Sequence, residues 1–104
     1  MEINYLKYNE YTKTKRQRKI ELYINMLERD LRQLEQQLEC LNIAEKKEKK
    51  EGVEHTSEAI LVHRERIERI ITKLEDEKDT LVEQKQCLQE DIQQILTKIV
   101  QLTT

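Results

Sequence analysis

The feature that most constrains this chain is the near-absence of helix-breaking residues. Gly52 is the only glycine among 104 residues, and there is no proline. Because glycine and proline are the residues that most often end or kink a helix, an apolar pattern with helical spacing can run unbroken on each side of Gly52. The sequence therefore predicts two long helices joined by one turn near the middle.

The apolar residues before Gly52 repeat with the spacing of a coiled-coil seam. Steps of four and three alternate along Ile20, Ile24, Leu27, Leu31, Leu34, Leu38 and Leu41. Such a repeat occupies the a and d positions of a heptad and indicates a coiled coil. We expect the repeat to break at Glu45 and Glu48. Backward it reaches Ile3 and Leu6 through three polar positions, so either the helix starts near residue 4 or residues 1–12 form a separate tyrosine-rich arm.

A second seam follows the turn. Its d positions are Ile60, Ile67, Leu74, Leu81, Leu88, Ile95 and Leu102, and its a positions are Ile71, Ile92, Ile99, Arg64, Lys78 and Lys85. Long basic side chains at a seam can bury their stems and keep their charges in water, and polar seam positions help to specify register. Leu61, Ile70, Val82 and Leu96 flank this seam and make the apolar stripe wider than one partner helix would cover.

The segment between the seams carries consistent turn signals. Lys46, Lys47, Lys49 and Lys50 favour the negative end of a helix dipole, and Gly52 suits the left-handed residue that follows a helix. Thr56 or Ser57 can cap the next helix. We expect one domain over residues 1–104, with helix one over about 4–50, the turn over 51–57 and helix two over 58–102.

Two registers of the hairpin are open. In an antiparallel pair, the numbers of residues at the same level add to a constant. A sum of 105 places Leu38 level with Ile67, and a sum of 112 places Leu38 level with Leu74. The sum of 112 is favoured, because it leaves room for a loop and keeps Ile20–Leu41 opposite apolar residues more continuously.

The predicted fold class is all-α: a long antiparallel two-helix coiled-coil hairpin that dimerises into a four-helix bundle. Charged residues make up 38% of the chain and aromatic residues 4%, a composition that suits a narrow seam better than a compact core. Small folds with thin cores usually need oligomerisation. The flanking apolar residues form the expected dimer or partner face: Tyr23, Leu61, Ile70, Val82 and Leu96.

Nothing in the sequence indicates catalysis, a cofactor or a metal. There is no glycine-rich phosphate loop and no catalytic triad spacing. His55 and His63 have no Cys or carboxylate at a metal-ligand spacing. Cys40 and Cys87 would lie at least roughly 20 Å apart in either register, too far for a disulfide. We expect two free thiols and no enzyme activity.

Charge, hydropathy and cysteine content also limit the expected partners and location of the protein. A net charge of -2 argues against general adhesion to nucleic acid or membrane by the whole surface. No apolar run approaches the roughly 20 residues of a membrane span, and residues 1–11 do not have the layout of a targeting segment. Two cysteines without a signal peptide suggest a reducing, cytoplasmic location.

A cluster of five cations precedes the first heptad run: Lys13, Lys15, Arg16, Arg18 and Lys19. Cations directly before a leucine heptad resemble a basic-region zipper, whose basic helices enter the major groove. The resemblance covers residues 9–41, but the Asn9-to-Arg18 spacing is one residue off and the expected alanine pair is absent. Tyr5, Tyr8 and Tyr11 could stack on bases or on a partner, although a small aromatic cluster that closes this end of the hairpin is preferred.

A second resemblance covers most of the chain. A tyrosine-rich start, a heptad helix, a turn ending in TSEA (56–59) and the segment KLEDEKDTLVEQK (73–85) resemble the N-terminal coiled-coil hairpin of phage and mobile-element regulators. These are the ArpU/RinA-type, sigma-factor-like proteins of low-GC Gram-positive bacteria. In that family a helix-turn-helix follows the hairpin, and this sequence does not contain it. The resemblance implies a dimerising or partner-binding module.

The functional expectation is a non-enzymatic protein-interaction module, such as a small phage-type regulator, inhibitor or adaptor that binds a host protein and no small-molecule substrate. The candidate contact points away from the seam are Leu22, Met26, Leu61, Val62 and Val100. The alternative is a nucleic-acid-binding regulator that uses residues 13–19.

Overall fold

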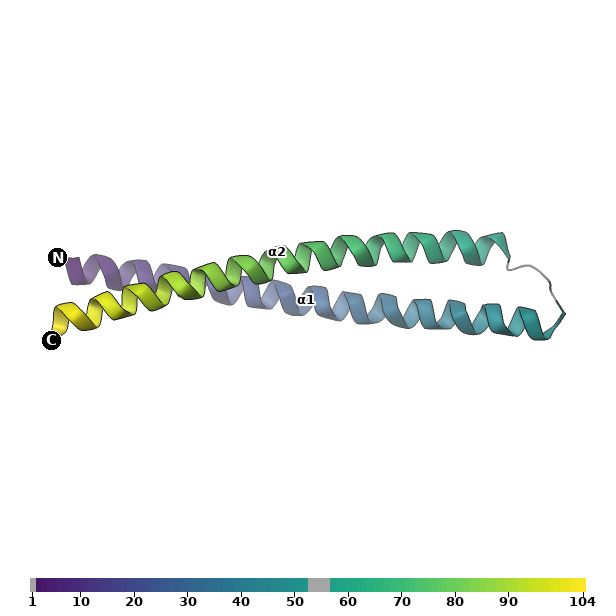
Figure 1. Cartoon of the computed structure of the whole chain (residues 1–104), viewed down its shortest axis with the longest axis horizontal. Helices are drawn as coiled ribbons and strands as arrows, with labels where there is room; N and C mark the ends of the chain where they lie inside the picture. Colours follow the sequence, from purple (N-terminus) through teal and green to yellow (C-terminus); the bar gives the residue numbers. More distant parts are fainter. Residues whose placement is uncertain (1, 53–56) are drawn as a thin grey trace. The chain divides into compact units, whose positions relative to one another are not determined.

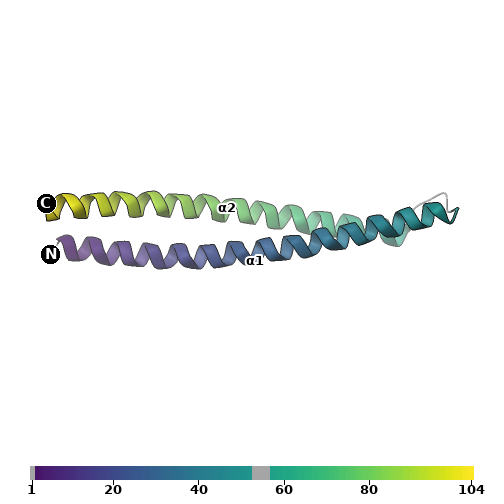
Figure 2. The ribbon, with the colours of Figure 1, turned by 90° about the horizontal axis from the view of Figure 1, so that it is seen from below.

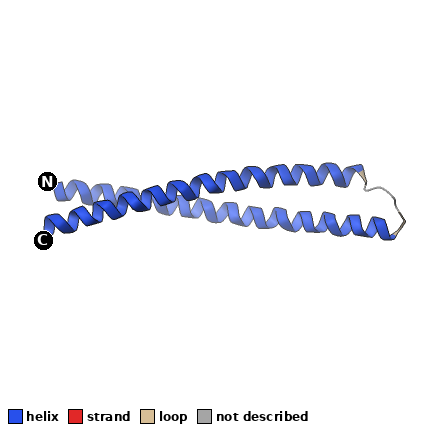
Figure 3. Cartoon of the chain, viewed as in Figure 1, coloured by secondary structure: helices blue, strands red, loops and turns tan. Residues whose placement is uncertain are grey.

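The chain forms two long helices. The structure, a computed structural model, describes residues 2–52 and 57–104. Helix α1 comprises Glu2–Lys50 and helix α2 comprises Glu58–Thr103. Within these described residues there is no strand (Figure 3). The expected all-α hairpin is confirmed, with α1 starting two residues earlier than expected and α2 ending one residue later.

The hairpin divides into two units, each made of one part of α1 and one part of α2. Unit 1 contains Met1–Met26 and Lys78–Thr104, and unit 2 contains Leu27–Glu77. In unit 1 the first part of α1 and the last part of α2 lie side by side and run antiparallel, as two perpendicular views show (Figures 1 and 2). In unit 2 the rest of α1 and the start of α2 form the second antiparallel pair.

The seam of each unit follows the heptad pattern. Every a and d position from Ile3 to Glu48 in α1, and from Ser57, the residue before α2, to Ile99, is buried or half-buried. The most buried residues are Leu6, Ile24 and Ile95 in unit 1, and Leu27, Leu31 and Ile67 in unit 2. Leu102, the last d position, is 43% exposed. The apolar seam positions therefore form the core of the hairpin.

The start of α1 belongs to this seam. Leu6 is buried, Ile3 is half-buried, and Lys98 Nζ lies 3.6 Å from Glu2 Oε1. The alternative of a separate arm over residues 1–12 is wrong. The three polar seam positions at 10, 13 and 17 do not interrupt the helix because they are only half-buried, which leaves a path for their charged or polar ends to reach the surface.

Polar contacts between the helices identify the register. The residue numbers of the paired residues sum to values between 100 and 109, in the pairs Glu2–Lys98, Lys13–Asp91, Glu21–Lys85, Glu48–Ser57 and Glu45–Arg64. These values centre on the register with a sum of 105, so the preference for 112 is wrong. The register with a sum of 105 also leaves space for the turn. Glu48 is level with Ser57, so Lys49 and Lys50 extend past the start of α2.

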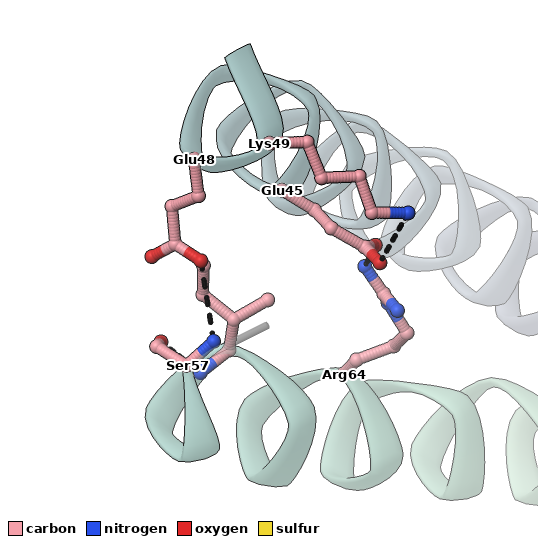
Figure 4. Close-up of polar contacts among 6 residues, drawn as sticks. Glu45, Glu48, Lys49, Ser57 and Arg64 are labelled. Carbon is pink, nitrogen blue, oxygen red and sulfur yellow. Dashed lines mark hydrogen bonds and ion pairs between the residues drawn. The ribbon is translucent and has the colours of Figure 1, made fainter. Parts of the chain in front are cut away.

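The end of α1 helps to cap α2 in unit 2 (Figure 4). The Ser57 backbone N–H donates to Glu48 Oε2 at 3.2 Å, and Ser57 Oγ accepts from the Ile60 N–H at 3.3 Å. Ser57 is therefore the N-cap residue, satisfying one of the N–H groups that a helix start leaves unpaired. The other expected cap, Thr56, lies outside the described residues.

The seam continues through polar residues where the sequence suggested that it stops. Glu45 and Glu48 are half-buried. The Arg64 guanidinium pairs with Glu45 Oε2, and Lys49 Nζ lies 3.6 Å from Glu45 Oε1 (Figure 4). The expected heptad break is therefore wrong: ion pairing and capping replace apolar contact in the last two seam positions of α1.

Gly52 has a φ of +86°, as expected for the residue that follows a helix. A Cβ added there would meet no atom within 4 Å. The cost of Gly52→Ala is therefore conformational, and we expect it to lower the free energy of unfolding by about 1–2 kcal/mol. Gly52→Asn should cost less, because asparagine tolerates this conformation. Urea unfolding followed by circular dichroism measures both, and equal losses would contradict this explanation.

Candidate functional site

One face of α1 in unit 1 combines exposed aromatic, basic and aliphatic side chains. We call it the outer α1 stripe: Tyr8, Tyr11, Lys15, Arg18, Leu22 and Met26. Steps of three and four residues place these side chains on one face of the helix. All six are exposed, with Tyr8 at 70%, Leu22 at 65% and Met26 at 56%. They occupy outward heptad positions, so the intrachain seam does not use them.

The five cations of the basic cluster do not share one environment. Lys13 occupies a seam position, and its Nζ pairs with Asp91 Oδ2 at 3.1 Å. The other four are exposed and make no ion pair with the described part of the chain: Lys15, Arg16, Arg18 and Lys19. Four of the five cations predicted to contact a partner are therefore available to an external anion or acidic side chain.

The layout of a basic-region zipper is not present in the structure. In that layout the basic helix separates from its coiled-coil partner to enter the major groove. Here the a and d positions of residues 9–19 are half-buried in the seam of unit 1, and Lys13 is paired across it. The same helix therefore presents its cations to the outside while its opposite face packs on α2.

The tyrosines do not form a packed aromatic cluster. Tyr5, Tyr8 and Tyr11 are all more than 60% exposed, so the preferred idea that they close the end of the hairpin is wrong. The physical reason is their heptad position: these residues fall at c, f and b, which face away from the seam. Tyr8 and Tyr11 instead begin the outer α1 stripe.

The expected dimer face is divided between two places. Tyr23, Val82 and Leu96 belong to unit 1, whereas Leu61 and Ile70 belong to unit 2, and all five are exposed. Within unit 1, Tyr23 is at a g position and Val82 and Leu96 are at e positions. In an antiparallel pair e positions flank one edge of the seam and g positions flank the other, so these three residues do not form one surface.

The remaining candidate residues form no recognisable chemical centre. Cys40 and Cys87 are free and exposed. In unit 2, Cys40 and His63 line a surface hollow of about 470 Å³ together with Gln33, Gln36, Gln37 and Leu41. Among residues 2–52 and 57–104, no group of three or more His, Cys, Asp or Glu side chains could hold a metal ion. His55 lies outside the described residues.

No helix within the described residues combines the length and the apolarity that crossing a bilayer requires.

The grouping of Leu22 and Met26 with the tyrosines and cations was missed at the sequence level. These residues were singled out as separate exposed positions. The signal that could have joined them is a second repeat of three and four residues along α1, displaced from the seam to the opposite side of the helix.

Comparisons of the chain with protein-family models, with curated proteins and with solved structures gave no match.

Proposed function

We propose that this chain is a non-enzymatic protein-interaction module, a small regulator or adaptor that binds an acidic, amphipathic segment of another protein. The observation that supports this proposal is the outer α1 stripe. A helix face that is not used in the fold but carries two tyrosines, two cations and two large aliphatic side chains has the composition of an interface. Tyrosine and arginine are also enriched among the residues that dominate binding energy.

The order of side chains along the stripe specifies the partner chemistry. Aromatic residues lie at its N-terminal end, cations in the middle and aliphatic residues at its C-terminal end. A partner helix with carboxylates flanked by apolar residues would pair its charges with Lys15 and Arg18 while covering Tyr8 and Leu22. The resemblance to phage regulators adds the expectation that this partner is a host protein.

A synthetic peptide tests this proposal: an amphipathic helix of glutamate and leucine, about three heptads long. The control is a peptide of the same length in which lysine replaces glutamate. Isothermal titration calorimetry should show saturable binding of the acidic peptide only. The Tyr8→Ala and Leu22→Ala variants should each weaken it at least about tenfold, as for central interface residues. The matched control is Val62→Ala, which is 48% exposed in unit 2.

Two results would count against this proposal. Equal binding of the acidic and basic peptides would exclude charge recognition. Equal weakening by Val62→Ala and by the stripe variants would exclude the outer α1 stripe as the surface involved.

A second candidate function is nucleic-acid binding, favoured by four exposed cations that lie beside exposed tyrosines and form no ion pair within residues 2–52 and 57–104. Four phosphate contacts would make duplex binding fall by ~100-fold between 50 and 200 mM salt. Tyrosines would add stacking on single strands. Fluorescence anisotropy of labelled duplex and single-stranded DNA separates this candidate from peptide binding, and no binding at low salt would remove it.

A further inference from the structure

A second heptad-spaced stripe runs along α2 in unit 1. We call it the uncharged α2 stripe: Val82, Gln86, Gln89, Gln93, Leu96 and Val100. Steps of four and three alternate along it, as in a coiled-coil seam. It contains no charged residue, although 38% of the chain is charged. A run of six outward positions without one charge is unlike an ordinary solvated helix face.

α1 does not cover this stripe. Each stripe residue directly follows a d or a residue of the seam. The stripe is therefore rotated by about 100° around α2 relative to the seam. All six residues are exposed, including Val82 at 43% and Leu96 at 41%. The stripe is also hollowed: a surface cavity of about 500 Å³ is lined by Val82, Gln86, Gln89 and Gln93, with Lys85 and Glu90 also in its wall.

The two edges of the stripe carry opposite charges. Lys85 lies on the edge nearer the seam and Glu90 on the outer edge, and both line the hollow. Lys85 Nζ is 3.3 Å from Glu21 Oε1, and its side chain is 37% exposed. Because an ammonium has three donors, Lys85 can keep its ion pair with Glu21 and donate a hydrogen bond to a second carboxylate. Lys85 and Glu90 are five residues apart, and one heptad earlier Lys78 and Glu83 have the same spacing on the same two edges.

We propose that the uncharged α2 stripe binds the same stripe of a second copy of this chain, with the two α2 helices parallel and in register. In a parallel pair, a residue on one edge meets the residue five positions later on the opposite edge of its partner, which is the usual interhelical ion pair of coiled coils. Lys85 then faces Glu90 of the second copy, and the two-fold symmetry repeats the pair.

Antiparallel pairing of the same stripe has poorer charge complementarity. If Val82 were level with Val100 of the second copy, Glu90 would face Glu90 across the symmetry axis. Like charges in such positions are destabilising. The parallel arrangement avoids this contact and gains two attractive ones.

Identical residues also match each other in the parallel register. Val82 meets Val82 and Leu96 meets Leu96, so the apolar ends of the stripe are covered. Glutamine carries both donors and acceptors, so each central glutamine can form a hydrogen bond with the same glutamine of the second copy. Polar seam residues fix register at a cost in stability. A seam of about 30 Å with three polar layers predicts a weak dimer, with dissociation in the micromolar range.

Sedimentation of the full chain tests the surface. The wild type should dimerise at high micromolar concentration, and the double variant Val82→Glu/Leu96→Glu should be monomeric with unchanged helicity. Val62→Glu is the control for adding a carboxylate, since it places one glutamate on an exposed apolar position of α2 in unit 2. A monomeric wild type, or a double variant that dimerises as strongly as the control, overturns the proposal.

Cysteine cross-linking tests the orientation. In a Cys40→Ser/Cys87→Ser background, Val82→Cys should give a disulfide-linked dimer on mild oxidation, because the two residues 82 are adjacent only in the parallel register. In the antiparallel register they would lie roughly 27 Å apart, far beyond disulfide reach. Val62→Cys is the control for random collision. A dimer that does not cross-link faster through residue 82 than through residue 62 overturns the parallel arrangement.

Charge exchange tests the ion pairs. Homodimers of the Glu90→Lys chain and of the Lys85→Glu chain each place like charges opposite each other, so each should dimerise at least about threefold more weakly than the wild type. Mixing the two chains restores opposite charges and should give heterodimer above the statistical amount. A statistical mixture would overturn the proposed pairs. These experiments do not involve the outer α1 stripe, so their failure leaves the proposed function standing.

Discussion

Replacing Ile67 with alanine is expected to lower the free energy of unfolding by about 2–5 kcal/mol. Ile67 is 2% exposed, less than any other core residue among 2–52 and 57–104. The substitution removes buried methyl and methylene groups and leaves a cavity that a two-helix seam can fill only by shifting one helix. Urea unfolding followed by circular dichroism at a fixed protein concentration measures the effect, since self-association would shift apparent stability.

The matched control for this change is Ile70→Ala. Ile70 is the same residue type, three positions later on the same helix and 41% exposed. Alanine has the higher helix propensity, so we expect a change within about 0.5 kcal/mol. Equal losses for the two variants would show that residue 67 is not in a buried seam.

The second large effect concerns the ion pair between Glu45 and Arg64. Both side chains are about 20% exposed, and Arg64 Nε is buried without a hydrogen-bond partner. In Glu45→Leu the Arg64 cation would stay at the seam without Glu45, so we expect a loss of about 1–3 kcal/mol. Glu39→Leu is the control, because Glu39 is an exposed glutamate on the same helix.

Replacing both partners should reverse this loss. In Glu45→Leu/Arg64→Leu, two apolar side chains extend the seam, and substitution of a buried pair by apolar residues is often stabilising by about 1–4 kcal/mol. A double-mutant cycle from denaturant unfolding gives the coupling energy. If the two single losses simply add in the double variant, Glu45 and Arg64 contribute no coupling energy, and the ion pair does not stabilise this part of the seam.

The helices themselves follow from the sequence because one physical rule governs them. Apolar residues at a and d must be covered, and within residues 2–52 and 57–104 only Gly52 has the positive φ of the left-handed conformation, just after α1. These two facts predict an antiparallel hairpin of all-α class. The structure agrees, and it extends the seam to polar positions such as Lys13 and Glu45 that pattern matching had treated as interruptions.

The register was harder to predict because the heptad repeats equally well at two sums that differ by one heptad. Both registers place apolar residues opposite each other. The two registers differ in polar contacts, which the heptad pattern does not reveal. Glu48 accepts a hydrogen bond from the Ser57 N–H in unit 2, and Lys13 pairs with Asp91 in unit 1. Capping and ion pairs of this kind depend on side-chain reach rather than on hydrophobic period.

The candidate surfaces were only partly visible in the sequence. The basic cluster and the exposed apolar residues could be read off, but their separation into faces depends on which side of the seam each one flanks. Tyr23 and Val82 were therefore grouped although they flank opposite edges, whereas Leu22 and Tyr8, which share a face, were not joined.

The placement of the tyrosines makes the protein its own spectroscopic probe. The chain has four tyrosines and no tryptophan or phenylalanine, and all four lie on α1 between Tyr5 and Tyr23 in unit 1. Absorbance and emission in the near ultraviolet therefore originate from this segment alone. A ligand at the outer α1 stripe should change the tyrosine emission directly, while pairing through Val82 and Leu96 should leave Tyr8 and Tyr11 in water, so one unlabelled sample can distinguish the two events.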